Sequence, residues 1–332
     1  MAAGAAIAAV AMALPERRVS NQQLAARLGV DADWISKRTG TRERPWASAD
    51  ERLSALAAEA GRRALERAGV APHDVDLVLV ATSTADEITP NAGPLVAGLI
   101  GADQAGALDI GAACTGWLSA LSLACGQIES CRARHALVVG ADFLSRFLDE
   151  SDRDTAPLFA DGAGAAVLSG TESADERVGP VVLRADHSGS HLIRLARGEQ
   201  IQMEGAEAFR AGVSSLAEVT SQALAASDCR LDEIDLFVYH QANSRILRAV
   251  GQRLGLPPER VVDYVDRFAN ASTATLPIAL TVAESEGRVQ PGDRVLLAAF
   301  GGGLTWGATV VQWSSRASSP PAAPAAVQPA TA

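Results

Sequence analysis

The chain repeats one local pattern in its two halves, and this repeat constrains the fold most strongly. A helical stretch that begins at Leu56 leads into the apolar run 75–80, and one that begins at Leu216 leads into the run 234–238. Asp76 and Asp235 occupy the same place in the two copies, an offset of 159 residues (235 − 76). Short apolar runs that alternate with amphipathic helices are typical of α/β layers. We therefore expect two similar α/β halves packed around a pseudo-twofold axis.

Further apolar runs extend this interpretation along the chain. The runs 136–139 and 295–299 contain no polar alternation, which predicts strands buried on both faces. Glycines at 162–164 and 301–303 are expected to come just before two other apolar strands. We expect one half at residues 1–170, the other at 171–314, and a disordered tail at 315–332, where Ser, Pro and Ala dominate.

Composition excludes several classes of protein. Lys and Arg number 29 against 39 Asp and Glu, a net charge of −10, which disfavours nucleic acid as a partner. Four cysteines without a paired spacing favour a reducing compartment, so we expect a cytoplasmic protein without disulfides. The Ala-rich segment 1–14 lacks a preceding basic region and predicts a buried first strand, not a signal peptide. No segment approaches the roughly 20 apolar residues that span a membrane.

Three short motifs carry residues suited to thioester chemistry. Cys114 lies in Ala-Ala-Cys-Thr-Gly, His240 in His-Gln-Ala-Asn, and Asn270 in Asn-Ala-Ser-Thr-Ala-Thr. A thiol can be the nucleophile, while an imidazole and a carboxamide can polarise a carbonyl. The offset of 159 places Cys114 opposite Thr273, and each precedes an apolar helix, so the two helix N-termini should face each other. A thiolate at Cys114 would be stabilised there and be reactive near neutral pH.

Each residue also has a purely structural interpretation. Cys114 could fill the core of an Ala-rich helix, His240 could lie in a surface turn, and Asn270 could cap the helix that follows it. Papain-like proteases share the three residue types, but their Cys lies in a Cys-Gly-Ser/Ala-Cys-Trp/Tyr context that is absent here. Only the joint occurrence of the motifs in matching contexts favours catalysis.

The motifs resemble those of the β-ketoacyl-[acyl-carrier-protein] synthase III family. The resemblance extends from Ala8 to Trp313 and is carried by residues 34–40, 109–121, 136–142, 159–168, 240–243 and 300–307. It implies a thiolase-like fold with layered αβαβα architecture and a homodimer. It also implies that Cys114, His240 and Asn270 form the catalytic triad, and that the backbone N–H groups of Cys114 and Gly302 form the oxyanion hole.

The resemblance also implies the substrates and the residues that hold them. These are an acyl-CoA, a malonyl thioester and an acyl carrier protein, with no metal or redox cofactor. The nucleotide end of coenzyme A would contact Trp34, Arg38 and Arg153, and its pantetheine arm would pass Asn243. The other residues that the family motifs place at the substrate are Phe159 and Thr89.

The implied reaction is a decarboxylative condensation catalysed by an acyltransferase. Cys114 would take an acyl group from a thioester, and His240 and Asn270 would stabilise the enolate that malonyl forms on losing carbon dioxide. A related acyltransferase on the same scaffold, in which His240 deprotonates a hydroxyl or amine acceptor, remains an alternative. A non-catalytic paralogue is a third possibility.

Some positions depart from the usual family pattern or fall outside it. Thr89 stands where a bulky aromatic from the partner subunit often selects the primer, and Ala206 replaces a common Asn. These changes predict a longer or branched acyl starter, as in polyketide starter-unit enzymes. Arg245 and Arg248, with Arg253, are spaced to share a helix face and predict a docking surface for an acidic carrier protein. His187 and His191 are separated by a loop-forming Ser-Gly-Ser, so no metal pair is expected.

Overall fold

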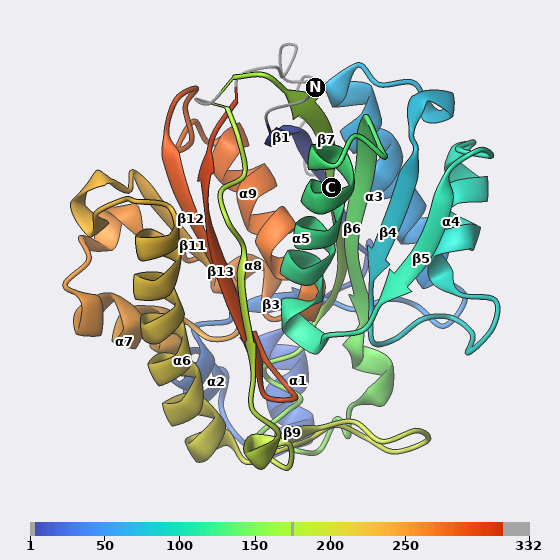
Figure 1. Ribbon diagram of the computed structural model, residues 1–332. Coiled ribbons are helices and arrows are strands. Elements are labelled where there is room, and N and C mark those ends of the chain that lie inside the picture. The colour runs from blue at the N-terminus through green and yellow to red at the C-terminus, as the bar shows by residue number, and fades with distance from the viewer. Residues whose placement is uncertain (1–3, 174–175, 315–332) are drawn as a thin grey trace, which may run out of the picture.

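Two β-sheets form the body of the molecule in the computed structural model, which describes residues 4–173 and 176–314 (Figure 1). The first sheet contains, in spatial order, β1 (Gly4–Ala13), β7 (Asp161–Thr171), β6 (His135–Phe143), β4 (Leu77–Ala81) and β5 (Gly106–Ile110). The second contains β8 (Val182–Ala185), β13 (Thr305–Gln312), β12 (Arg294–Gly301) and β11 (Leu236–Tyr239). The predicted tail at 315–332 lies outside the described residues.

The two sheets have the same topology. In the first, β4 runs parallel to β6, and β7 is antiparallel to both β6 and β1. In the second, β11 runs parallel to β12, and β13 is antiparallel to both β12 and β8. The counterpart of β5 is reduced to a single parallel bridge between Phe237 and Val261. The predicted repeat of an α/β unit is therefore confirmed, while the boundary at residue 170 stays a prediction.

Helices form three layers around the sheets. Two helices lie between the sheets, α5 (Gly116–Glu129) and α9 (Thr275–Ser285), and Figure 1 shows both in the middle of the molecule. The outer face of the first sheet is covered by α3 (Leu53–Ala68) and α4 (Ala92–Ile100). The outer face of the second is covered by α6 (Gly205–Ala226) and α7 (Ser244–Leu254). The order is αβαβα, as predicted.

The central helices are apolar on nearly every face because both sheets pack against them. In α9 every residue from Thr275 to Ala283 is buried, and no charged residue occurs before Glu284. A helix that is hydrophobic all round is the pattern of a buried helix. In contrast, α7 has a strong apolar stripe and an opposite face with exposed arginines. Position in the layers thus follows from how polar residues are distributed around each helix.

Close packing of the sheets on α9 explains the glycines of β7. The prediction that residues 162–164 come before a strand is wrong, because β7 begins at Asp161 and contains them. A Cβ atom on Gly164 would lie 2.8 Å from Cγ of Pro277 at the start of α9. These glycines therefore let a central helix approach the strand.

A small subdomain closes one end of the molecule. It contains the pair β2 (Arg18–Ser20) and β3 (Glu43–Pro45), and the helices α1 (Asn21–Leu28) and α2 (Ala32–Thr39). Ser20 begins α1 with a reciprocal capping box to Gln23, and Asp31 caps α2. The guanidinium of Arg44 is fully buried and donates to Asn21 and to two backbone carbonyls, which ties this subdomain to the body.

The remaining α-helix and strands are short. They are α8 (Val265–Phe268) and the two-residue strands β9 (Ile193–Arg194) and β10 (Gln202–Met203), which pair with each other. Among the described residues, no helix is both long enough and apolar enough to cross a membrane.

Candidate active site

Two short turns meet at the centre of the molecule, one from each half. Cys114 lies in the 3₁₀ turn η2 (Ala113–Thr115), which leads into α5, and the turn η7 (Ser272–Ala274) leads into α9. The Ser272 hydroxyl lies 3.5 Å from Sγ of Cys114. A Cβ atom on Gly116 would lie 3.1 Å from Cγ2 of Thr273. The structure thus brings together the two helix N-termini that the repeat predicts to face each other.

The two turns share an unusual backbone conformation. Ala113 has a φ of 43° and Ser272 a φ of 49°, both in the left-handed region, and the two residues are 159 positions apart. For a residue other than glycine this conformation costs about 1–3 kcal/mol. Strain of this kind persists where the surrounding packing enforces it, and it concentrates at functional sites. The pseudo-twofold repeat therefore extends to the backbone of the site itself.

Cys114, His240 and Asn270 line one cavity of about 550 Å³. Cys114 enters from η2, His240 from the loop after β11, and Asn270 from the loop that joins α8 to η7. A parallel β-bridge joins Phe159 to Asn270. It holds this loop against the segment that immediately precedes β7. Two halves of the chain therefore contribute to one pocket.

His240 is fixed by hydrogen bonds at the end of β11. Its backbone N–H donates to the carbonyl of Ala298 over 2.8 Å, and its Nδ1 lies 2.6 Å from the hydroxyl of Thr275. That hydroxyl has one proton and also lies 3.0 Å from the carbonyl of Ser272. When the hydroxyl donates to Nδ1, the single proton of the neutral ring lies on Nε2. Burial lowers the pKa of His240 to about 3, so the ring is neutral at physiological pH.

The amide of Asn270 is oriented by its own turn. Its Oδ1 accepts from the backbone N–H of Ser272 over 2.9 Å, as in a capping interaction. This bond assigns the carbonyl side of the amide, and the NH₂ group remains as the donor side. Asn270 can therefore cap its turn through Oδ1 and still donate to a substrate through its NH₂ group.

The prediction that Cys114 ionises near neutral pH is wrong for the free protein. Burial raises the pKa of its thiol to about 11, and the nearby charge of Asp142 acts in the same direction. Hydrogen bonds from Ser272 and from the backbone N–H groups of Cys114 and Gly302 favour the thiolate but do not compensate. Removal of water costs the charged form more than these donors return.

Two backbone N–H groups favour the ionised form of the sulfur. They belong to Cys114 and to Gly302, which follows the end of β12. A Cβ atom on the neighbouring Gly301 would lie 2.8 Å from both the Cβ and the N atom of Cys114. Glycine is therefore required at 301 for the hairpin to approach the nucleophile.

The mouth of this cavity is lined by cations and an indole. The guanidinium of Arg38 stacks 4.7 Å from the centre of the Trp34 ring. Arg153 donates to the carbonyls of Leu28 and Gly29, at the end of α1. The predicted residues Trp34, Arg38 and Arg153 are thus brought together at one opening, where an anionic ligand would be attracted.

Asn243 also lines the opening and has a structural role in addition. Its Oδ1 caps α7 by accepting from the N–H of Arg245 over 2.8 Å. Its Nδ2 donates to the carbonyl of Arg38 over 3.2 Å. Asn243 therefore joins α7 to the end of α2, which fixes two walls of the opening.

Sequence comparison identifies the family of this chain. Residues 108–187 match the family described as 3-oxoacyl-[acyl-carrier-protein] synthase III, and residues 224–313 match its C-terminal part. The chain is 44% identical over 308 residues to the β-ketoacyl-[acyl-carrier-protein] synthase III of Rhizorhabdus wittichii, an alignment that covers 91% of this chain and 97% of the relative. The chain belongs to the 3-oxoacyl-[acyl-carrier-protein] synthase III family.

Solved structures of the synthase III family have the same fold. The enzyme from Aquifex aeolicus superposes with a TM-score of 0.91 at 36% identity, covering 93% of this chain and 100% of that one. A priming β-ketosynthase from a polyketide biosynthetic pathway superposes with a TM-score of 0.90 at 33% identity, covering 94% and 97%. The predicted thiolase-like fold is confirmed.

A second cavity in this synthase III chain lies on the other side of Cys114. It measures about 790 Å³ and shares Cys114, Phe159 and Ile193 with the first. Its remaining lining comes mainly from the segments 82–88 and 193–198. Thr89 is exposed and lines neither cavity of its own chain. Cys114 therefore lies between the two cavities.

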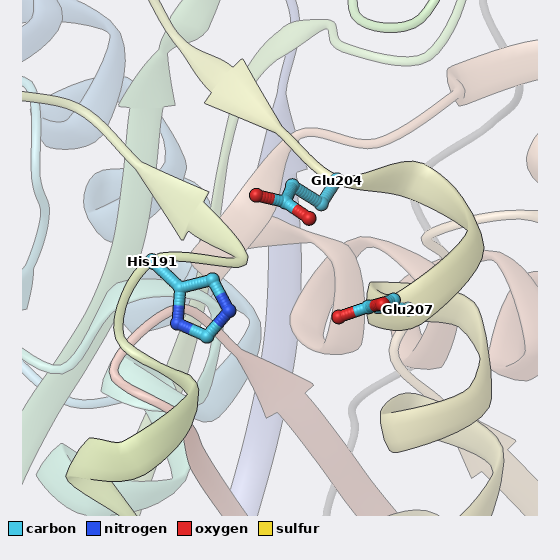
Figure 2. Close-up of side chains that lie close together, drawn as sticks. All are labelled: His191, Glu204 and Glu207. Atoms are coloured by element: carbon cyan, nitrogen blue, oxygen red, sulfur yellow. The ribbon is translucent and has the colours of Figure 1, made fainter.

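Outside these cavities, the described residues contain one group that could hold a metal ion. His191, Glu204 and Glu207 place one potential ligand atom each within 4.8 Å of one another, and Figure 2 shows the two carboxylates and the ring around a common space. All three are exposed, and such acidic groupings are common on an acidic surface. His187 lies in a 3₁₀ turn and is not part of the group.

Three residues near the catalytic side chains lie within the motifs, but the motifs assign them no role. Ser272 contacts Cys114, Thr275 contacts His240, and Asp142 lies buried beneath both turns. The offset of 159 pairs Ser272 with Ala113 and could have drawn attention to that turn. Asp142 ends the segment 136–142, which carries part of the family resemblance but predicts only a buried strand.

Proposed function

We propose that this synthase III chain condenses an acyl thioester with a malonyl thioester and releases carbon dioxide. The observation that carries the proposal is the convergence of Cys114, His240 and Asn270, from both halves of the chain, on one cavity. The names of the relatives describe the same activity for those proteins. The chemistry requires no metal or redox cofactor, because the thioester and the departing carboxylate supply the driving force.

In the first step Cys114 attacks the acyl thioester. The backbone N–H groups of Cys114 and Gly302 stabilise negative charge at the sulfur, and a carbonyl bound there would place its oxygen near both donors. Preorganised donors of this kind stabilise the negative charge of a tetrahedral intermediate. Collapse of that intermediate leaves an acyl-enzyme and a free thiol.

In the second step His240 and Asn270 act on the malonyl thioester. The Nε2–H of His240 and the NH₂ group of Asn270 would donate to its carbonyl oxygen. The enolate formed as carbon dioxide leaves is stabilised by both donors. Its carbon attacks the acyl group on Cys114, which gives a β-ketoacyl thioester and restores the thiol.

The cations at the opening are proposed to bind the phosphates of coenzyme A. The Arg38 and Arg153 side chains line the opening, and the face of Trp34 is suited to stack on an adenine ring. We expect Arg38→Ala to raise KM for acyl-CoA about tenfold while kcat changes little, since a phosphate contact contributes equally to the ground state and the transition state. An unchanged KM in steady-state assays would reject this role.

Mass spectrometry of the protein and its products tests the proposed reaction. Incubation with an acyl-CoA should add one acyl group to Cys114, and addition of malonyl-carrier should release carbon dioxide and remove it. Cys114→Ala should abolish the adduct, whereas His240→Ala should retain the adduct and lose decarboxylation. An adduct that is passed to a hydroxyl or amine acceptor without carbon dioxide would support the alternative acyltransferase. The absence of any adduct would indicate a non-catalytic protein.

The acyl group is proposed to occupy the second cavity, with a longer or branched chain preferred. This cavity of about 790 Å³ opens next to the loop that bears Thr89, and Thr89 is smaller than the aromatic residue usual at that position. Competition between acetyl-CoA and hexanoyl-CoA for Cys114 measures the preference. Preferential loading of acetyl would refute it, and Thr89→Phe should shift loading toward acetyl.

Arg245 and Arg248 are proposed to contact an acidic carrier protein. Both are exposed on α7, and Arg245 lines the opening and lies 5.6 Å from the ring of Phe209. The double change to Glu should raise KM for malonyl-carrier and leave acylation by acyl-CoA intact. Arg253→Glu, on the same predicted helix face but outside the lining of the cavity, tests how far the docking surface extends. Equal loss of both activities in the double variant would reject docking.

A homodimer is proposed from the free edge of the first sheet. Among the strands of residues 4–173 and 176–314, the edge strand β5 pairs with β4 alone. Leu108 on β5 is 43% exposed, and Ile88 is 77% exposed. An unpaired edge with exposed apolar residues is suited to pairing with a second copy. Sedimentation should show a dimer that Leu108→Lys dissociates; a monomeric wild-type protein would exclude it.

A cytoplasmic location is proposed as well, because the four cysteines are unpaired.

A further inference from the structure

The backbone of Asn270 is held by one short segment, residues 158–160. The N–H of Asn270 donates to the carbonyl of Leu158, and its carbonyl accepts from the N–H of Ala160, each over 2.9 Å. The segment therefore runs beside Asn270 as one strand runs beside another, with Phe159 directly opposite. Because both backbone groups of Asn270 are bonded to it, a displacement of this segment displaces the carboxamide as well.

The other edge of this segment is bonded to the indole of Trp46. Since the groups on either side of Phe159 face Asn270, the backbone groups of Phe159 itself face the opposite edge. There the Nε1–H of Trp46 donates to the Phe159 carbonyl over 3.0 Å. Trp46 is 2% exposed, and a buried carbonyl that loses its donor is destabilising. The indole N–H thus fixes the segment from the side opposite Asn270.

Three more hydrogen bonds join the stretch 42–47, which contains β3, to the chain around this bridge. They run from the N–H of Arg42 to the carbonyl of Asp266 (3.0 Å), from the guanidinium of Arg44 to the carbonyl of Pro157 (3.4 Å), and from the N–H of Ala47 to the carboxylate of Asp161 (2.7 Å). The first reaches α8, which precedes Asn270, and the other two end on either side of 158–160. The stretch 42–47 therefore backs both chains of the bridge, and Trp46 is its contact at the bridge itself.

We propose that Trp46 is a positioning residue that fixes the carboxamide of Asn270 for the condensation step. It acts through the carbonyl of Phe159 and lines neither cavity, so it touches no substrate. Cys114 and His240 are held elsewhere, in η2 and at the end of β11. The inference rests on the proposed role of Asn270 as a donor to the malonyl carbonyl. Loss of the indole N–H should therefore slow the malonyl step and spare acylation of the sulfur.

Substitution of Trp46 by Phe removes the N–H and keeps an aromatic ring in the buried space. Carbon dioxide release from malonyl-carrier by the preformed hexanoyl-enzyme should fall about tenfold, because a small misplacement of a catalytic group is costly. Single-turnover acylation by hexanoyl-CoA, measured by intact-protein mass, should stay within about twofold of wild type. Phe159 lines both cavities, so damage that acts through its ring would slow acylation too. Equal loss of both rates, or loss of neither, overturns the proposal.

A double-mutant cycle separates positioning from general damage to the fold. Asn270→Ala leaves no carboxamide to position, so Trp46→Phe should have no further effect on the residual decarboxylation in that background. Thr275→Val perturbs His240 instead, and in that background the loss of about tenfold should persist. A further tenfold loss in the Asn270→Ala protein would show that Trp46 acts on the fold in general, and would overturn the proposal.

Hydrogen exchange at the N–H of Asn270 tests the contact without any substrate. This N–H is bonded to the carbonyl of Leu158, so its exchange reports how firmly the segment 158–160 is held. Trp46→Phe should speed its exchange about tenfold, and a wild-type exchange rate overturns the proposal. If the wild-type protein is acylated but never releases carbon dioxide, the proposed function fails. Exchange at Asn270 then still tests whether Trp46 holds its backbone.

An isosteric replacement keeps the test decisive if Trp46→Phe folds poorly. In 3-benzothienylalanine a sulfur atom takes the place of the indole N–H, so the shape of the buried ring is retained while the donor is lost. At position 46 this residue should reproduce the slow decarboxylation, the normal acylation and the fast exchange at Asn270. Wild-type behaviour in all three measurements would show that the N–H has no role.

A second buried tryptophan provides a matched control. Trp313 is 4% exposed and follows the end of β13, whose start lies near Cys114 through the contact between the Thr305 and Thr115 hydroxyls. It packs in a different hydrophobic cluster from Trp46 and Phe159. Trp313→Phe should therefore match wild type in both half-reactions and in exchange at Asn270. A selective loss of decarboxylation in this variant would contradict a specific role for Trp46.

Discussion

The buried neutral imidazole of His240 should make the protein sensitive to acid in a way that a single substitution removes. Burial lowers the pKa of His240 from its ordinary value of 6.5 to about 3. In the unfolded chain the ring binds a proton below pH 6.5, whereas in the folded protein it does not until about pH 3. Unfolding therefore takes up a proton in this window, and the free energy of unfolding falls as the pH falls.

The magnitude follows from the width of the window. Each pH unit below 6.5 costs about 1.4 kcal/mol of stability, so at pH 4.5 the contribution of His240 is a loss of about 2.7 kcal/mol. His240→Asn keeps a polar side chain beside Thr275 but cannot titrate. Between pH 7.5 and pH 4.5, the free energy of unfolding of His240→Asn should therefore fall by about 2.7 kcal/mol less than that of wild type.

Urea unfolding followed by circular dichroism measures both proteins at both pH values, at one protein concentration. The change in the free energy of unfolding between the two pH values is then compared between wild type and His240→Asn. This comparison cancels the contributions of Asp142, Asp161 and Glu284, since these groups titrate in both proteins. If wild type and His240→Asn lose equal stability on acidification, the imidazole is not held neutral by burial. The proposed role of Nε2–H as an uncharged donor at physiological pH would then lose its basis.

Other perturbations test the packing around the site. Gly301→Ala would place a Cβ atom 2.8 Å from Cys114, so acylation should fall at least roughly 10²-fold in a single-turnover assay; a wild-type rate would contradict the close approach. Thr275→Val removes the 2.6 Å contact to His240 and should slow malonyl decarboxylation roughly tenfold while Cys114 still acylates, as measured by carbon dioxide release and intact mass. Ser20→Ala removes the capping box of α1 and should lower the free energy of unfolding by about 1 kcal/mol in urea; no change would mean that the cap contributes nothing. Gly93→Ala would push a Cβ atom to 2.8 Å from the backbone of Leu108, and should destabilise the fold by about 1–3 kcal/mol and weaken the proposed dimer, as sedimentation would show.

Much of the architecture could be predicted because it depends on local patterns. The strands 136–139 and 295–299 are apolar without alternation, and β6 and β12 are buried as expected. The offset of 159 predicts equivalent elements, and it holds for the starts of β6 at His135 and β12 at Arg294. The position of Gly162 and Gly164 could not be predicted, because glycine marks a turn and a tightly packed strand equally well.

The candidate site could be predicted in its membership but not in its electrostatics. Cys114, His240 and Asn270 were found from their motifs and line one cavity. The expectation of an ionised thiol used only the helix N-terminus, which is a local feature. The raised pKa arises from segments far along the chain that exclude water from the sulfur.

The sequence by itself determined the repeated α/β pattern, the family and the residue types that meet at the site, because these depend on periodicity and on short motifs. Tertiary structure alone decided that Asp142 lies against the turn η7, that His240 is neutral, and that two cavities share Cys114. The physical reason is that desolvation and hydrogen-bond geometry depend on atoms more than 100 residues apart, such as Asp142 and Thr273. No local sequence pattern predicts which distant residues will exclude water from the site.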